Sequence, residues 1–79
     1  MTDREQLRHE LAAWISEILI SDVDPDREDA AFIDDYGADS MDIVDIVEKV
    51  ERTYDVTITN AQVATVRTFG DLVDLILAG

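Results

Sequence analysis

The chain has 79 residues, 47% of them hydrophobic, and its 19 acidic and 6 basic residues give a formal net charge of -13. A chain of this length buries only about 60% of its unfolded surface, so we expect one small domain, residues 1–79, without an internal catalytic cleft. The charge argues against nucleic acid and anionic lipid as partners, and the absence of cysteine excludes disulfides, thiolate metal sites and a thiol nucleophile.

The first predicted helix spans about residues 3–20. Thr2 and Glu5 match a capping box, in which two side chains satisfy free N–H groups at a helix start. Apolar residues then recur at helical spacing and form one stripe: Leu7, Leu11, Trp14, Ile15 and Ile18.

A long loop is predicted over residues 21–39, where the helical periodicity disappears. Loops of this length in compact domains are commonly functional or disordered. The apolar side chains Phe32, Ile33 and Tyr36 favour a packed loop, which we expect to contact the core.

Three further helices are predicted after this loop. The second spans about residues 40–53 and is followed by an extended segment, in which Tyr54, Val56 and Ile58 alternate with polar residues. A short third helix, capped by Thr59 or Asn60, reaches about residue 65, and Thr68 with Asp71 caps an apolar fourth helix. The predicted fold is therefore an all-α four-helix bundle with a long first loop and a short third helix.

The second helix has two chemically different sides. At 100° per residue, one side collects Ile43, Ile46, Val47 and Val50, and the other collects Asp42, Asp45, Glu48 and Glu51. Met41 falls between Asp45 and Glu48, so its apolar side chain should point outward. A solvated face is the ordinary interpretation of such acids. Residues 22–48, however, hold 11 acids and only one base, which favours a docking surface for a basic partner.

Ser40 opens this helix, and helix capping is the ordinary role of a serine at such a position. Asp39 is a rival cap. If Asp39 caps the helix, Asp42 occupies the third helical position and the Ser40 hydroxyl is free. A phosphodiester on that hydroxyl would lie near unpaired backbone N–H groups, where helix starts tolerate negative charge.

The segment Gly37-Ala38-Asp39-Ser40-Met41 resembles the Gly-x-Asp-Ser-Leu motif of the acyl carrier proteins. The resemblance extends over the whole chain, through its length, acidity, long first loop, acidic second helix and short third helix. It implies that Ser40, flanked by Asp39, carries a covalent 4'-phosphopantetheine arm whose thiol holds acyl groups as thioesters. It also implies that Met41, Asp42, Asp45 and Glu48 contact partners such as a phosphopantetheinyl transferase, a ketosynthase or an acyltransferase. Such a protein is a carrier with no catalytic residue of its own.

Two departures from the family's common pattern bear on the pathway. Met41 replaces the usual leucine, and residues 60–65 lack the acidic start of the third helix found in housekeeping fatty-acid carriers. Both favour a dedicated pathway such as polyketide assembly. Ala38 and Asp42 favour an acyl carrier over a peptidyl or aminoacyl carrier. An unmodified acidic protein that docks through the second helix is a further alternative.

No metal site is predicted. Asp22, Asp24 and Asp26 alternate as in a calcium loop, but Arg27 replaces the required glycine and Ile33 the bidentate glutamate. His9 has no second histidine or cysteine with which to share a metal.

The remaining expectations concern the location of the protein and the fate of an acyl chain. No apolar stretch approaches the roughly 20 residues of a membrane span, and residues 1–5 do not resemble a signal peptide. We therefore expect a cytoplasmic protein. The capping box at Thr2 and the apolar stripe running nearly to Gly79 favour a freestanding protein, which we expect to be a monomer. A carried chain could enter the core among Phe32, Ile46, Val47, Val50, Ile58, Leu72 and Ile76.

Overall fold

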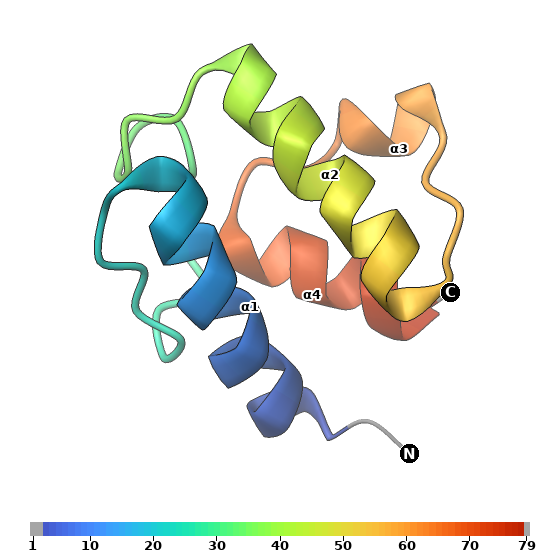
Figure 1. The fold of residues 1–79 in the computed structure, drawn as a ribbon, viewed down its shortest axis with the longest axis horizontal. Coiled ribbons are helices and arrows are strands. Elements are labelled where there is room, and N and C mark those ends of the chain that lie inside the picture. Colours follow the sequence, from blue (N-terminus) through green and yellow to red (C-terminus); the bar gives the residue numbers. More distant parts are fainter. Residues whose placement is uncertain (1–2, 79) are drawn as a thin grey trace.

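The computed structural model describes residues 3–78, which form four helices: α1 Arg4–Leu19, α2 Ser40–Tyr54, α3 Asn60–Val63 and α4 Phe69–Ala78. α1 packs against both α2 and α4, and the long loop joins α1 to the start of α2 (Figure 1). The described residues contain no strand beyond an isolated antiparallel bridge between Ala31 and Thr68. The predicted all-α four-helix architecture is confirmed.

The start of α1 differs in detail from the prediction. Asp3 is the N-cap, and its carboxylate accepts a hydrogen bond from the Glu5 N–H at 3.4 Å. The capping box expected at Thr2 lies outside the described residues. An aspartate at the N-cap supplies the same acceptor as a serine or threonine, and its charge favours the positive helix end.

The other boundaries fall close to the predicted ones. Tyr54, expected in the extended segment, is the last residue of α2. Thr59, rather than Asn60, caps α3 and forms a capping box with Gln62. That helix ends at Val63, earlier than predicted, because the N–H groups of Thr65 and Val66 bond three residues back instead of four. Thr68 and Asp71 bond each other's backbone N–H at the start of α4, as predicted.

The core is one cluster of buried side chains from α1, α2, α4 and the long loop. Its largest fully buried members are Phe32, Phe69, Leu7, Leu11, Ile15, Ile46, Leu72, Val50 and Val73. The rings of Phe32 and Phe69 meet edge to face, with centroids 6.5 Å apart. The loop therefore contributes its own aromatic anchor to the core, as its sequence predicts.

Ile33 does not share this role, and its predicted packing is wrong. Its side chain is 60% exposed, whereas that of the preceding Phe32 is 1% exposed. The Phe32 N–H donates to the Arg67 carbonyl at 3.0 Å, and the Phe32 ring packs against Phe69 in the core. Ile33 lies on the surface.

The loop is also joined to the segment that opens α4. The N–H groups of Phe69 and Gly70 donate to the carbonyls of Ala30 and Glu28, at 3.0 and 2.8 Å. A Cβ added to Gly70 would lie 2.9 Å from the Glu28 carbonyl oxygen, so the close approach requires glycine. These bonds hold residues 28–32 against α4.

A cluster of charges ties the same loop to two helices. Arg4 of α1 donates to Glu28 in the loop and to Asp74 of α4, the latter at 2.8 Å. Arg8, one turn further along α1, lies 3.5 Å from the Glu28 carboxylate and donates to the Pro25 carbonyl. The hydrogen bonds from Arg4 lower the pKa of Glu28.

Ile20, which the sequence placed inside the first helix, is instead its C-cap. Its backbone is left-handed, with φ 52° and ψ 46°, and its side chain is 92% exposed. This conformation costs a residue with a Cβ about 1–2 kcal/mol, and here no burial offsets the cost.

Replacing Ile20 by glycine is therefore expected to stabilise the protein. Glycine adopts φ > 0 freely, so Ile20→Gly should raise the free energy of unfolding by about 0.5–1 kcal/mol, measured by urea denaturation. Asp55→Gly, at the left-handed C-cap of α2 with φ 54°, is the matched control. Asp55→Gly should raise the free energy of unfolding less than Ile20→Gly, because aspartate tolerates the left-handed backbone conformation better than isoleucine. A lower stability of Ile20→Gly would show that the strain is absent.

Candidate functional site

The candidate site is the first turn of α2. Asp39 is the N-cap, and its Oδ1 accepts a hydrogen bond from the Asp42 N–H at 2.9 Å. In return Asp42 Oδ2 accepts from the Asp39 N–H at 3.2 Å, which completes a capping box. Ser40 is the first helical residue and is exposed. The predicted arrangement, in which Asp39 caps the helix in place of Ser40, is confirmed.

The turn before the site is fixed by small residues. Gly37 has φ 68°, a left-handed conformation that favours glycine. Its N–H donates to the Ile33 carbonyl at 3.1 Å, and the Ala38 N–H donates to the Phe32 carbonyl at 2.9 Å. The Ala38 side chain is buried at 4% exposure. The turn therefore carries the chain from the Phe32 anchor to Asp39 in a defined geometry.

The Asp39 cap provides a direct test of this geometry. Asp39→Ala removes the acceptor for the Asp42 N–H and should lower the free energy of unfolding by about 1 kcal/mol. Asp39→Asn keeps an equivalent cap and should lower the free energy of unfolding only slightly. Comparing the two variants therefore separates the effect of capping from the effect of charge. Urea denaturation of both variants measures the difference. Equal losses in the two variants would contradict the capping role.

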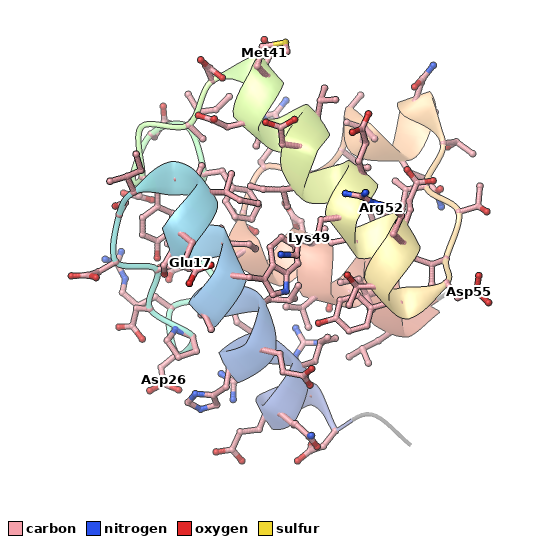
Figure 2. The ribbon with its side chains drawn as sticks, in the orientation of Figure 1. Glu17, Asp26, Met41, Lys49, Arg52 and Asp55 are labelled. Carbon is pink, nitrogen blue, oxygen red and sulfur yellow. The ribbon has the colours of Figure 1, made fainter. Side chains whose placement is uncertain are left out.

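Beyond Asp39 and Ser40, the predicted partner-binding residues fall into two groups. Met41 is 67% exposed and lies at the end of α2 that carries Ser40 (Figure 2). Asp45 and Glu48 are also exposed on α2. Asp42 is only partly exposed, and its carboxylate accepts the Asp39 N–H in the capping box, so it stabilises the start of α2.

Two apolar side chains near this surface are exposed although the sequence did not predict it: Val44 was not singled out, and Ile33 was expected to pack. Val44 on α2 is 44% exposed, and Ile33 in the loop is 60% exposed. Val44 is four residues after Ser40, which places it 40° from Ser40 on the helical wheel and beside Glu48. The same wheel that placed Met41 outside would have identified Val44, whereas nothing local distinguishes Ile33 from Phe32.

Two bases follow these acids on α2: Lys49 comes directly after Glu48, and Arg52 comes one helical turn after it. The Lys49 ammonium lies 5.1 Å from the centre of the Trp14 ring on α1, and Arg52 is in the last turn (Figure 2). The ion pairs found within residues 3–78 all use Arg4 or Arg8. We therefore define the α2 docking surface as Met41, Val44, Asp45 and Glu48, an exposed patch that combines acidic and apolar side chains.

The first turn of α2 fits a phosphodiester attached to the serine oxygen. The Ser40 hydroxyl is exposed at a helix N-terminus, where backbone N–H groups and the helix dipole favour an anion. The Asp39 and Asp42 carboxylates each direct one oxygen to a backbone N–H, which offsets part of their repulsion of a nearby phosphate.

A model of the family described as "Phosphopantetheine attachment site" matches residues 9–76, most of the chain. The chain belongs to the acyl carrier protein family. It is 38% identical over 76 residues to an acyl carrier protein of Thermotoga maritima, an alignment that covers 96% of this chain and 94% of that one. It is 35% identical over 66 residues to an acyl carrier protein of Sulfurovum sp., covering 78% and 88% of the two chains.

Membership establishes the class of activity. Acyl carrier proteins are carriers and not enzymes, and they bear 4'-phosphopantetheine covalently. They work with a phosphopantetheinyl transferase and with acyl-processing enzymes. In the part of this carrier that the structure describes, no helix has the length and apolar character needed to cross a membrane.

Proposed function

We propose that Ser40 carries the phosphopantetheine arm, and that the arm presents acyl intermediates as thioesters to enzymes of a polyketide-type pathway. The observation that carries this proposal is the exposed hydroxyl of Ser40, which the Asp39 cap releases from the usual capping role of a serine. Fatty-acid synthesis is the second candidate pathway.

The other two serines of the chain support this choice by their surroundings. The Ser16 hydroxyl donates to the Ala12 carbonyl and accepts from the Val23 N–H at 3.0 Å, so it joins α1 to the loop. Ser21 is partly buried just after the end of α1 and does not begin a helix. Only Ser40 combines exposure with a helix N-terminus.

The α2 docking surface is the part of the carrier that we propose contacts its enzymes. Asp45 and Glu48 attract basic partner surfaces over a distance, and Met41 and Val44 add apolar contact beside Ser40. The transferase, a ketosynthase and an acyltransferase are the partners expected there. Each must reach Ser40 or its arm from this side.

The preference for a polyketide-type pathway rests on surface chemistry. Met41 is flexible and polarizable, so it can contact partners of a different shape from those that meet the usual leucine. The first turn of α3 holds no acidic residue. Met41 is directly after Ser40, and Asn60 of α3 lines a groove together with Val44 and Glu48 of α2. The single-domain, monomeric and cytoplasmic character expected from the sequence stays a prediction.

Incubation with coenzyme A and a broad-specificity phosphopantetheinyl transferase tests the attachment. We expect the intact mass to increase by one arm, and Ser40→Ala to lose the increase completely because the accepting oxygen is absent. Ser21→Ala should keep it. No gain in the unaltered protein, or an undiminished gain in Ser40→Ala, would overturn the proposal and favour an unmodified acidic docking protein.

A further inference from the structure

Met41 carries an accessible sulfur atom. The chain has no cysteine, so its sulfur atoms belong to two methionines, and Met1 lies outside the described residues. Met41 is 67% exposed, and its side chain lies at the outer edge of the molecule, at the end of α2 that carries Ser40 (Figure 2). Within residues 3–78, Met41 therefore holds the one sulfur that an oxidant can reach, and no thiol competes with it before an arm is attached.

The aromatic side chains are less accessible to an oxidant than this thioether. Trp14 is half-buried, and the Lys49 ammonium lies 5.1 Å from the centre of its ring. Tyr36 and Tyr54 are half-buried as well. An exposed methionine takes up one oxygen atom and becomes a sulfoxide, which is a common oxidation in proteins.

Met41 also supplies much of the apolar contact of the α2 docking surface. Val44 and Asp45 follow it by three and four residues, so both lie beside it one helical turn further along α2. Val44, the other apolar member of the surface, is 44% exposed against 67% for Met41. A partner that covers Met41 removes its thioether from water, and this burial is favourable while the side chain stays apolar.

A sulfoxide at this position would change the chemistry of the contact. Its oxygen is a hydrogen-bond acceptor, whereas the polar members of the α2 docking surface, Asp45 and Glu48, are carboxylates that accept and do not donate. The sulfoxide oxygen therefore finds no donor among them. A partner that binds the thioether in an apolar contact would have to bury this oxygen without a hydrogen bond, which weakens docking.

We propose that Met41 is a site of reversible oxidation by hydroperoxides, and that its sulfoxide slows the docking of partners on the α2 docking surface. The sulfur lone pair forms an S–O bond to one peroxide oxygen while the O–O bond breaks. With hydrogen peroxide, the other oxygen takes up the proton and leaves as water. The thioether loses two electrons and the peroxide gains them. This proposal rests on the proposed attachment at Ser40 and adds a regulation of the same surface.

The test oxidises the carrier before an arm is attached. The protein is treated with hydrogen peroxide, which catalase and gel filtration then remove, so the transferase and coenzyme A meet no oxidant. Tandem mass spectrometry should find one added oxygen in the tryptic peptide of residues 28–49, where Met41 is the only methionine. The kcat/KM of the transferase should fall about 10-fold, the effect of burying one unpaired polar atom. Methionine sulfoxide reductases for both epimers should restore the mass and the rate.

Two substitutions at the same position assign the effect to the sulfur. Met41→Leu is apolar and has no sulfur, so peroxide treatment should leave its kcat/KM at the value measured before treatment. This control also reports any oxidation of Met1 or Trp14. Met41→Gln places a polar amide on a side chain of similar length, and its kcat/KM should be low without peroxide.

Urea denaturation separates slower docking from unfolding. The Met41 side chain is exposed, so the oxidised carrier should unfold at the same urea concentration as the untreated one. A slower reaction together with a lower urea midpoint would overturn the proposed role of Met41, because loss of structure would then explain the rate.

The remaining outcomes distinguish this proposal from the attachment at Ser40. Failure to load the untreated carrier overturns the attachment and the role of Met41 with it. Normal loading of the untreated carrier, with the same rate once Met41 is oxidised, overturns the role of Met41 alone. An unoxidised Met41 after peroxide treatment, or an equal loss of rate in treated Met41→Leu, has the same meaning.

Discussion

Reversing the charge of the α2 docking surface is expected to slow modification of the carrier by about 10- to 1,000-fold at low salt, the range of electrostatic steering. The change is the double substitution Asp45→Lys and Glu48→Lys. Both carboxylates are exposed on α2 in the two turns after Ser40, and neither is among the ion pairs found in residues 3–78. The measurement is kcat/KM of the transferase, from timed intact-mass spectra.

The matched control changes the net charge equally at a different place. Glu10 and Glu17 are exposed on α1, and Figure 2 shows Glu17 there. The double substitution Glu10→Lys with Glu17→Lys therefore alters the total charge without changing a residue of the α2 docking surface. The kcat/KM of the transferase should fall much less with this control variant than with the α2 variant. Raising the ionic strength to 1 M shortens the Debye length to about 3 Å. The difference in kcat/KM between the unaltered carrier and the α2 double variant should then become smaller. Equal losses in both double variants would mean that net charge, rather than the α2 docking surface, directs docking.

Phe32→Ala is expected to lower the free energy of unfolding by about 3–5 kcal/mol, the typical cost of removing a buried phenylalanine. The ring is 1% exposed and meets the edge of Phe69, and its backbone is bonded to Arg67 and Ala38. Small domains are stable by only about 5–15 kcal/mol, so this loss takes a large share of the total. Urea denaturation followed by circular dichroism measures it.

Ile33→Ala is the neighbouring control in the same loop. Its side chain is 60% exposed, so the substitution should change the free energy of unfolding by about 0.5 kcal/mol or less. A small loss in Phe32→Ala, comparable with that of Ile33→Ala, would show that the loop does not depend on its aromatic anchor.

The helices and the start of α2 were predictable because their signals are local. Asp39, Ser40 and Asp42 are close in sequence, so competition between two caps can be weighed from the residues alone. The outward direction of the Met41 side chain could be predicted from the 100° angle between neighbouring helical positions. The same reasoning missed the last residue of α2 and placed Ile20 inside α1, because helix ends depend on single backbone conformations that leave no periodic pattern.

The contacts of the long loop were not predictable in the same way. The sequence indicated a packed loop through Phe32, but Arg4 pairs with Glu28 and Asp74, which are 24 and 70 residues away. A groove lined by Phe32, Ile43 and Val66 similarly combines side chains from the loop, α2 and the segment before α4. Such contacts depend on how the elements pack in three dimensions, and a single sequence carries no pattern for them.

The most direct test of the central claim locates the arm on the modified chain. Trypsin cleavage after Arg27 and Lys49 releases residues 28–49, in which Ser40 is the only serine and no threonine is present. Ser16 and Ser21 fall in a different peptide, residues 9–27. Tandem mass spectrometry of the loaded protein should find the phosphopantetheine on Ser40 in residues 28–49. An arm on residues 9–27, with residues 28–49 unmodified, would contradict the account.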